Sequence, residues 1–389
     1  MTNGEHTTQK RQVDACMKRI LFMPFLQISS GHHQVANGII NSLHETNDMF
    51  ECEKIDILSY SYGHIEVFIS KFYIKWIHLF PKLYSWLYKK SAYKNEYEKK
   101  RFYLYEWLFL YWMEKLIKDK KPQLIICTHA LPSYLVSRLK QKGKISIPVI
   151  NVYTDYFINQ IWGEKFIDYH FVPNKEIKET LIKHGVKSDH VLVTGIPIHP
   201  RFKVQAKVRK QKGVSSVLIS GGNLGTGLMK TFVETLQPTG KINYTVLCGK
   251  NTKLYNWINQ MSHPFIHAVP YISSKEDMNE LYDRVDAIIT KPGGVTVSEC
   301  LYKKIPIFIY HELPGQEEIN LRNLKDWGLV YHLENWRESP DLEQKIVTAL
   351  HCDKHQKRLN QQLDTYHQQL SKENISVFIE KLFANNCTK

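Results

Sequence analysis

Short apolar segments alternate with helical patterns in two separate series along this chain. In the first series, residues 19–25 read as a buried strand, and the helical spacing of Val35, Ile39 and Leu43 then predicts a helix over 34–44. Strands that alternate with helices predict an α/β domain built on a parallel sheet. Further strands are expected at 124–127, 149–153, 170–172 and 191–193, with helices at 133–142 and 175–184.

A second series of the same kind begins at Ser216. Residues 195–213 separate the two series and read as a linker, because they contain two prolines and a basic, glycine-containing stretch. Strands are then expected at 217–220, 244–248, 287–290 and 305–310, with helices at 227–236, 278–282 and 295–301.

A chain of 389 residues is long enough for about two domains of ordinary size. We therefore predict an α/β chain of two Rossmann-like domains that face a ligand cleft. The first domain is expected over 17–200 and the second over 201–365. Residues 1–16 are expected to be an extension with little structure.

The composition is that of an ordinary soluble protein, with 43% hydrophobic and 23% charged residues. No apolar run reaches the roughly 18 residues of a spanning helix, and the polar start of the chain does not resemble a secretory leader. The 7 cysteines are scattered along the sequence, which argues against a disulfide framework and against a thiolate zinc site. This cysteine usage favours a reducing cytoplasm.

The formal net charge of +14 predicts an anionic partner, either nucleic acid or an anionic membrane face. Between residues 60 and 112 lie 19 of the 47 aromatic residues, together with nine Lys or Arg and four Glu. Rings interleaved with lysine suit the interface of an anionic bilayer, and we favour this interpretation for Phe72, Lys75, Trp76 and Trp86. Packing in the protein core is the alternative for these residues, and a core helix is the alternative for residues 103–112. Stacking of single-stranded RNA on the rings is a further alternative.

Two glycine-rich turns follow expected strands of the second domain. Gly221 and Gly222 open a loop before a helix, where backbone N–H groups could hold a phosphate; a tight turn that needs glycine for steric reasons is the alternative. Gly293 and Gly294 form the second turn, whose amides could face a diphosphate. Glu299 follows in the next helix and could accept the two hydroxyls of a ribose, or could simply cap the helix.

Polar residues follow two other expected strands. Gln316 and Glu317 are of the types that hydrogen-bond sugar hydroxyls, although a solvated polar loop is the alternative interpretation. His32 and His33 follow the first strand, and a neutral imidazole at that position could act as a general base near neutral pH. Most histidines are surface or packed residues, so position on this loop is what distinguishes these two. No convincing set of metal ligands is found, and no metal is expected.

In combination, these segments resemble the lipid-directed sugar transferases of glycosyltransferase family 28. The most similar members are processive diacylglycerol β-glucosyltransferases and monogalactosyldiacylglycerol synthases. The resemblance extends over nearly the whole chain, and its last two segments are highly specific to the family. It is carried by Gly31 with His32, by residues 151–155 with Trp162, and by the segments 194–200, 248–252, 289–299 and 314–317.

The resemblance implies a GT-B fold whose first domain binds a lipid acceptor and the membrane, and whose second domain binds a UDP-sugar as co-substrate. It implies an inverting transfer, without metal or cofactor, of a hexose from UDP-glucose or UDP-galactose to diacylglycerol. The product would be a β-glycosyldiacylglycerol, made by a peripheral enzyme at the cytoplasmic face of the cell membrane. A helix within 366–389 would return to the first domain.

The same resemblance implies a role for each candidate residue. His32 would activate the lipid hydroxyl, with His33 as the open alternative, while Asp155 would orient the base or bind the acceptor and Trp162 would lie beside the acceptor. The donor would be bound in the second domain. There Tyr271 and Ile272 would contact the uracil, Glu299 the ribose, Gly221, Gly222, Gly293 and Gly294 the phosphates, and Gln316 with Glu317 the sugar.

Two other interpretations remain open on the residues alone. The same fold could act on another acceptor, such as an undecaprenyl-linked sugar, or could serve a UDP-sugar epimerase. A basic nucleic-acid-binding protein would account for the charge and the rings, but it leaves the paired glycine turns and Gln316 with Glu317 unexplained. We therefore predict no nucleic-acid partner.

Overall fold

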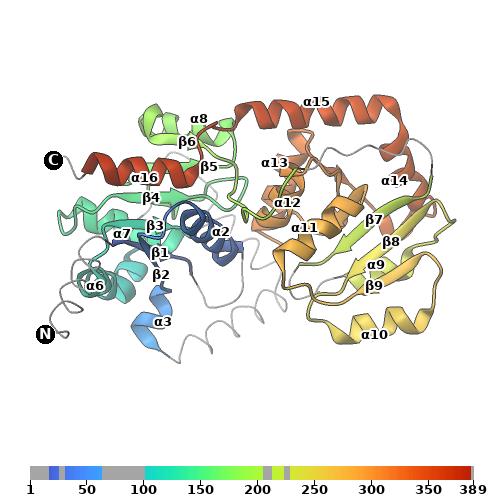
Figure 1. The fold of residues 1–389 in the computed structure, drawn as a ribbon, viewed down its shortest axis with the longest axis horizontal. Coiled ribbons are helices and arrows are strands. Elements are labelled where there is room, and N and C mark those ends of the chain that lie inside the picture. Colours follow the sequence, from blue (N-terminus) through green and yellow to red (C-terminus); the bar gives the residue numbers. More distant parts are fainter. Residues whose placement is uncertain (1–16, 26–30, 64–100, 205–212, 223–227, 387–389) are drawn as a thin grey trace, which may run out of the picture. The chain divides into compact units, whose positions relative to one another are not determined.

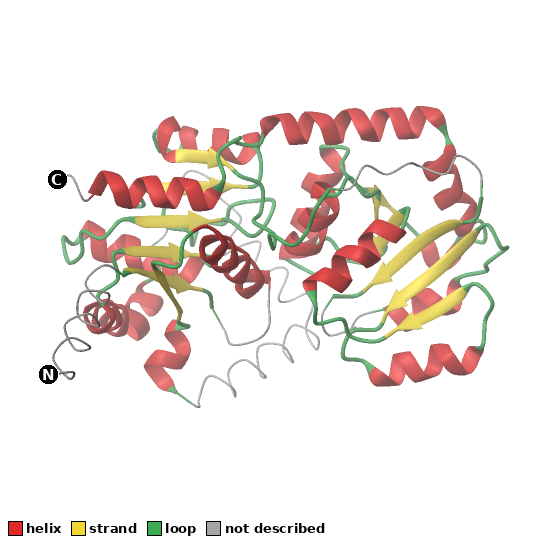
Figure 2. Cartoon of the chain, viewed as in Figure 1, coloured by secondary structure: helices red, strands yellow, loops and turns green. Residues whose placement is uncertain are grey.

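A computed structural model describes residues 17–25, 31–63, 101–204, 213–222 and 228–386 (Figure 1). The chain forms two compact units. Unit 1 comprises Met1–Thr154, Ile158–His199 and Ser371–Lys389, and unit 2 comprises Asp155–Phe157 and Pro200–Leu370. Each unit contains one six-stranded sheet of parallel strands with helices packed around it (Figure 2).

The sheet of unit 1 has the strand order β2-β1-β3-β4-β5-β6. Every residue of its central strands β3 and β4 is buried, as in parallel sheets that helices cover on both faces. Its strands are β1 (Lys18–Met23), β2 (Phe50–Lys54), β3 (Leu124–Cys127), β4 (Val149–Val152), β5 (Tyr169–Val172) and β6 (Val191–Val193). Its described helices are α2 (Gly31–Thr46), α3 (Ile57–Tyr62), α6 (Tyr103–Lys120), α7 (Ala130–Gln141), α8 (Lys175–Lys183), the 3-10 turn η2 (Ser188–His190) and α16 (Ile375–Asn386).

In the sequence, the unit 2 segment Pro200–Leu370 separates helix α16 from the rest of unit 1, yet α16 packs within unit 1. The Phe383 ring lies 5.6 Å from the Phe50 ring, and the Phe378 ring lies 5.0 Å from the Tyr169 ring. Ser42 of α2 donates a hydrogen bond of 3.3 Å to Ser376. These contacts bury the apolar side of the helix against α2 and the sheet.

The sheet of unit 2 has the strand order β12-β11-β10-β7-β8-β9. Its core includes Val217, Ile219, Tyr244, Ile289 and Phe308, all at most 1% exposed. Its strands are β7 (Ser215–Ser220), β8 (Ile242–Leu247), β9 (Ile266–Val269), β10 (Ala287–Thr290), β11 (Ile307–Ile309) and β12 (Tyr331–His332). Its described helices are α9 (Met229–Thr235), α10 (Thr252–Met261), α11 (Lys275–Arg284), α12 (Gly294–Tyr302), α13 (Gln316–Asp326), the 3-10 turn η3 (Trp336–Glu338), α14 (Leu342–His351) and α15 (Asp353–Gln369).

The α/β prediction is confirmed, and the segments 124–127, 191–193 and 287–290 coincide with β3, β6 and β10. Strand β2 was not predicted. It lies at the edge of the sheet and exposes Glu51, Glu53 and Lys54, so it lacks the apolar run that marks the buried strands. Residues 1–16 and the predicted membrane contacts Phe72, Lys75, Trp76 and Trp86 lie outside the described residues.

Candidate active site

Each sheet has a topological switch point, a strand from which the chain continues to one side of the sheet and then to the other. In unit 1, β2 and β3 flank β1, and in unit 2, β8 and β10 flank β7. In open α/β sheets, ligands bind at such a point, outside the carboxyl ends of the strands. The segments that follow β1 and β3 carry His32 and Thr128, and those that follow β7 and β10 carry Gly222 and Gly293. Each unit therefore has a candidate ligand site at its own switch point.

The imidazole of His32 is held in a defined tautomer. His32 is the second residue of α2, and its Nδ1 lies 2.8 Å from the carbonyl oxygen of Thr128 and 2.9 Å from the hydroxyl oxygen of Thr154. A carbonyl oxygen can only accept a hydrogen bond, so Nδ1 carries a hydrogen and donates a hydrogen bond to the Thr128 carbonyl. In the neutral ring, Nε2 then carries the lone pair. This is the state that a general base needs before it accepts a proton.

A second imidazole, that of His129, lies edge-on against His32. The ring centroids are 4.7 Å apart and the ring planes are inclined by 82°. His129 caps α7, where its Nδ1 accepts the N–H of Leu131 at 3.1 Å. Burial, together with the neighbouring His32, lowers the pKa of His129 well below its ordinary value. His129 is therefore neutral near pH 7 and places no positive charge beside His32.

Asp155, which was predicted as an orienting or acceptor-binding residue, is fixed within unit 2 by Asn320 of α13. The Asn320 amide nitrogen donates to Asp155 Oδ1 at 2.9 Å and to the Pro292 carbonyl at 3.2 Å. The Asn320 side-chain oxygen accepts the N–H of Tyr156 at 2.8 Å. Asn320 is 1% exposed, and these three bonds leave its amide a single orientation. Asp155 is thus tied to the turn that follows β10.

Tyr156 makes two further hydrogen bonds to the same region of unit 2. Its hydroxyl lies 2.6 Å from the Ser298 hydroxyl in α12, and its carbonyl accepts the Asn323 side-chain amide at 2.8 Å. The Tyr156 side chain is fully buried. The segment Asp155–Phe157 therefore packs on both α12 and α13.

The turn after β10 is open at Gly293. This residue caps α12 with φ of −78° and ψ of 140°, and a Cβ added to it would meet no atom within 4 Å. Neither backbone strain nor crowding requires glycine there, whereas Gly222 has φ of +82°, a conformation that favours glycine. The Gly293 N–H donates to the Lys291 carbonyl at 2.8 Å, so the predicted phosphate contacts would come from amides that begin at Gly294.

Glu299 lies on α12 and is almost completely buried. Its Oε2 accepts the Tyr282 hydroxyl at 2.9 Å, and its Oε1 lies 3.6 Å from Lys275 Nζ. Burial raises the pKa of Glu299, and Lys275 and the Tyr282 hydroxyl oppose that shift. A carboxylate held in this way has a fixed direction and keeps acceptor capacity for a hydroxyl pair.

The other predicted donor residues follow three strands of unit 2, β9, β11 and β7. Tyr271 follows β9, is 43% exposed, and lies with its ring centroid 5.5 Å from Lys250 Nζ. Ile272 is half-buried beside it in sequence. Gln316 begins α13, while Glu317 accepts the Leu313 N–H at 2.6 Å and pairs with Lys291 Nζ at 3.3 Å. Gly221 is buried directly after β7.

Comparisons with known proteins fit this geometry. The family model described as monogalactosyldiacylglycerol (MGDG) synthase matches residues 32–198. An uncharacterized glycosyltransferase, YkoN, of Bacillus subtilis (strain 168) is 43% identical over 367 residues, which cover 94% of this chain and 97% of that protein. The chain belongs to glycosyltransferase family 28.

Two further proteins are similar over most of the chain. The processive diacylglycerol beta-glucosyltransferase of Bacillus pumilus (strain SAFR-032) is 27% identical over 380 residues, which cover 92% of this chain and 93% of that protein. The crystal structure of Acinetobacter baumannii MurG is similar with a TM-score of 0.60 at 14% identity, and the match covers 95% of this chain and 99% of that one. The predicted GT-B fold is confirmed.

Trp162 of this family 28 glycosyltransferase lies in the core of unit 1. It is 8% exposed, and its ring centroid is 4.5 Å from that of Tyr153. Its predicted place beside the acceptor stays a prediction. Among the described residues, no group of three or more His, Cys, Asp or Glu side chains is placed to hold a metal ion.

Several residues of the candidate site were not predicted from the sequence. Thr128 and His129 directly follow β3, and the carboxyl end of a parallel strand is a position where ligands bind. Thr154 precedes Asp155 in a segment that already carried the resemblance. Lys275 had no such signal, because its role depends on a contact with Glu299 from another helix.

Proposed function

We propose that this family 28 glycosyltransferase moves glucose or galactose from UDP-glucose or UDP-galactose to diacylglycerol with inversion, giving a β-glycosyldiacylglycerol. The observation that carries the proposal is the oriented imidazole of His32. Its Nδ1–H is directed at the Thr128 carbonyl, and its Nε2 is left as the basic atom in the unit that matches the lipid-transferase model. The relative from Bacillus pumilus, a diacylglycerol glucosyltransferase by name, supports the acceptor class.

In this mechanism His32 Nε2 takes the proton of the acceptor hydroxyl. The hydroxyl oxygen forms a bond to the anomeric carbon of the sugar, while the bond from that carbon to the diphosphate oxygen breaks and UDP leaves. Attack from the side opposite the leaving group inverts the anomeric centre. The proton remains on His32 until water removes it, so the step is balanced without any further reactant.

Unit 2 would hold the donor. The first-turn amides of α12 from Gly294 onward, with the loop at Gly221 and Gly222, would bind the diphosphate and stabilise the negative charge that develops as UDP leaves. Glu299 would accept the ribose hydroxyls, and Gln316 with Glu317 would bind the sugar. Tyr271 and Ile272 would contact the uracil, whose ring can stack on an exposed aromatic side chain.

The residues also support a division of roles between domains. Residues 17–200 would bind the acceptor and the cytoplasmic face of the membrane, as a peripheral protein, and residues 201–365 would bind the UDP-sugar. Among the helices that the structure describes, none is long and apolar enough to cross a bilayer. Attachment to the membrane surface is consistent with that finding.

The test is product analysis with each donor separately. The full chain is incubated with diacylglycerol in anionic vesicles, UDP-glucose or UDP-galactose, and EDTA, and the lipids are separated by thin-layer chromatography and identified by mass spectrometry. A β-glycosyldiacylglycerol from one donor supports the proposal and identifies the sugar. If neither donor gives a glycolipid while the protein still binds UDP, diacylglycerol is not the acceptor.

A further inference from the structure

Helix α6 of unit 1 exposes a row of large apolar side chains. Tyr103 is 66% exposed, Leu104 63%, Trp107 80% and Tyr111 69%. Exposed single apolar residues are common, but four on one helix, three of them aromatic, form a contiguous patch. A core helix was one expectation for residues 103–112, and it describes only the other side of α6, where Phe109 and Met113 are buried.

The exposed residues share one face because successive helical residues are turned by about 100°. Positions 103, 107 and 111 are each four residues apart and therefore lie one above the other along the helix. Lys115 and Lys118 continue the same face toward the end of the helix and are exposed. Lys115 Nζ lies 5.5 Å from the Trp112 ring centroid, and Lys118 pairs with Glu114 at 2.7 Å. The face is thus aromatic in its first turns and carries lysines in its last turns.

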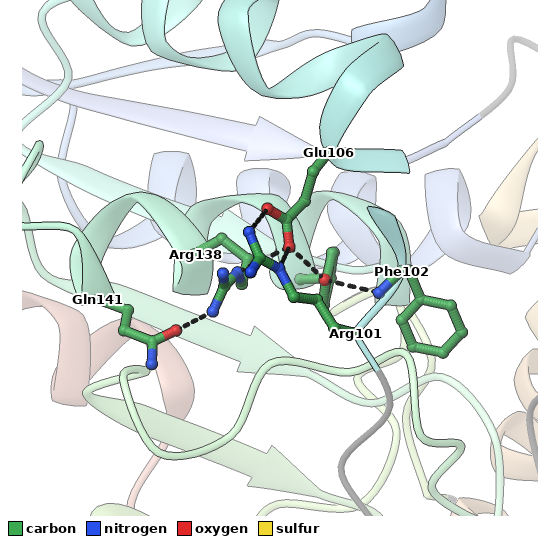
Figure 3. A network of polar contacts seen from close by, with 6 residues as sticks. Arg101, Phe102, Glu106, Arg138 and Gln141 are labelled. Atoms are coloured by element: carbon green, nitrogen blue, oxygen red, sulfur yellow. Dashed lines mark hydrogen bonds and ion pairs between the residues drawn. The ribbon is translucent and has the colours of Figure 1, made fainter. Parts of the chain in front are cut away.

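An ion cluster around the buried carboxylate of Glu106 fixes the beginning of α6, as Figure 3 shows. Glu106 accepts two hydrogen bonds from Arg101, at 3.0 and 2.9 Å, one from Arg138 of α7 at 2.9 Å and one from the Tyr134 hydroxyl at 2.8 Å. The Tyr134 hydroxyl in turn accepts the Phe102 N–H at 2.9 Å.

Arg101 also lies over the ring of Tyr103, 4.4 Å from its centroid. The Arg101 guanidinium therefore contacts both the Glu106 carboxylate and the first ring of the exposed face. The face is presented on a helix anchored to α7 at its first turn, and the exposed rings are not a consequence of a loose helix end.

We infer that this face of α6, formed by Tyr103, Leu104, Trp107, Tyr111, Lys115 and Lys118, docks on the surface of an anionic lipid bilayer. The inference rests on the proposed function, because an enzyme that uses diacylglycerol must reach its acceptor in a membrane. Aromatic rings suit the headgroup region, and lysines at one end of the face suit anionic headgroups. The chain has a net charge of +14, and residues 64–100, directly before the cluster, contribute eight lysines against three glutamates and no aspartate.

The test measures binding of the full chain to vesicles in the absence of diacylglycerol and UDP-sugar. Wild type and the double variant Trp107→Ala with Tyr111→Ala are sedimented with vesicles of phosphatidylcholine and phosphatidylglycerol at about three to one. The variant should need at least about tenfold more lipid for half-maximal binding, because two exposed rings are removed. The control, Tyr302→Ala, removes a 38% exposed aromatic residue of unit 2 and should bind as wild type does.

Charge gives a second, independent readout. Lys115→Gln and Lys118→Gln should each weaken binding to the anionic vesicles about fivefold, and should leave the weaker binding to pure phosphatidylcholine unchanged. All of these side chains are exposed, so circular dichroism should show unchanged melting temperatures. A variant that melts early is replaced by Trp107→Ser alone.

Failure of this inference differs from failure of the proposed function. If the Trp107 and Tyr111 variant binds vesicles as tightly as wild type, α6 is not the docking surface, whatever the protein catalyses. The inference also fails if light scattering shows that wild type is a dimer and the variant a monomer with equal vesicle binding, since a second copy would then occupy the face. If the variant loses vesicle binding but glycosylates diacylglycerol dispersed in detergent at the wild-type rate, the inference and the proposed function both stand.

Discussion

At the scale of single residues, the hydroxyl of Thr154 is the feature on which the proposed base depends most directly. Thr154→Val removes the hydroxyl 2.9 Å from His32 Nδ1 and nearly keeps the shape of the side chain. We expect kcat to fall about fivefold, the equivalent of one hydrogen bond, with the KM for UDP-sugar unchanged. Thr154→Ser keeps the hydroxyl and should restore the rate.

Two measurements separate orientation of His32 from a merely structural effect. Nitrogen NMR of labelled histidine should show the Nδ1–H tautomer for His32 in wild type and in Thr154→Ser, without any substrate. The pH profile of kcat/KM should change in Thr154→Val and not in Thr154→Ser. Equal activity and identical profiles for the two variants would remove Thr154 from the mechanism.

The residue scale also shows what the sequence could and could not predict. His32 was identified because it follows a recognisable strand, and that signal is local. The partners of its ring, Thr128 and Thr154, lie 96 and 122 residues away, on the ends of strands that become neighbours only when the sheet forms. A side chain can be nominated from its own segment, whereas its tautomer depends on groups that the fold brings to it.

At the scale of elements, the turn that precedes α12 offers a matched pair of glycines. Gly293→Ala should leave the melting temperature unchanged, because φ is −78° and a Cβ there would meet no atom within 4 Å. If the diphosphate approaches this turn, the added methyl group should raise the KM for UDP-sugar about tenfold. Gly222→Ala should instead lower the free energy of unfolding by about 1 kcal/mol, since φ is +82° there.

Melting curves and donor kinetics on the two variants check this prediction. A Gly293→Ala enzyme with wild-type donor kinetics would show that no ligand comes close to the turn. A Gly293→Ala enzyme that unfolds early would mean that the turn needs glycine for its own conformation, and its donor kinetics would then say nothing about the diphosphate.

The ion cluster at the start of α6 makes a prediction about stability and pH. Hydrogen bonds from Arg101 above all, then Tyr134 and Arg138, lower the pKa of Glu106 from 4.5 to about 2. The folded state therefore favours the carboxylate, and its contribution is complete above about pH 4.5 and is lost as the pH falls toward about 2. Glu106→Gln should lower the free energy of unfolding by about 2 kcal/mol at pH 7.

Urea unfolding at several pH values tests this. The difference between wild type and Glu106→Gln should shrink as the pH falls from about 4.5 toward about 2, because the carboxyl of the unfolded wild-type chain then binds a proton that the folded state does not bind. A difference that stays constant down to about pH 2.5 would show that packing of the side chain, and not its charge, stabilises α6. Lys118→Gln breaks an exposed pair on the same helix and should cost at most about 0.5 kcal/mol.

The sequence predicted some helices and strands better than others. Central strands such as β3 and β10 are buried at every position, so their apolar runs predicted them to the residue. The edge strand β2 and the amphipathic character of α6 were not predicted. One side of each element faces solvent. Polar and apolar residues are therefore mixed along both segments, and the packed side cannot be recognised from an apolar run.

At the scale of the whole molecule, two α/β units were predictable because the strand and helix series restarts after the linker, and family motifs occur in both series. The prediction that the last helix packs on the first domain came from the resemblance alone. The residues of the segment 375–386 do not by themselves indicate which domain the helix contacts. Its contacts with Phe50 and Tyr169 join segments more than 200 residues apart. Such pairings are set by the completed sheet and not by local pattern.

The division of the candidate residues between the units leads to the last prediction. His32 lies in unit 1, and Glu299, Gly293 and Tyr271 lie in unit 2. His32→Ala should therefore abolish transfer to diacylglycerol and leave the Kd for UDP, measured by calorimetry, unchanged. Glu299→Gln should do the reverse: it should weaken UDP binding about tenfold, through loss of a charge-assisted acceptor, while transfer at saturating donor continues. If His32→Ala loses UDP binding, or if Glu299→Gln binds UDP as wild type does, acceptor activation and donor binding are not divided between the two units. The assignment of His32 as the base that acts on the acceptor would then be wrong as well.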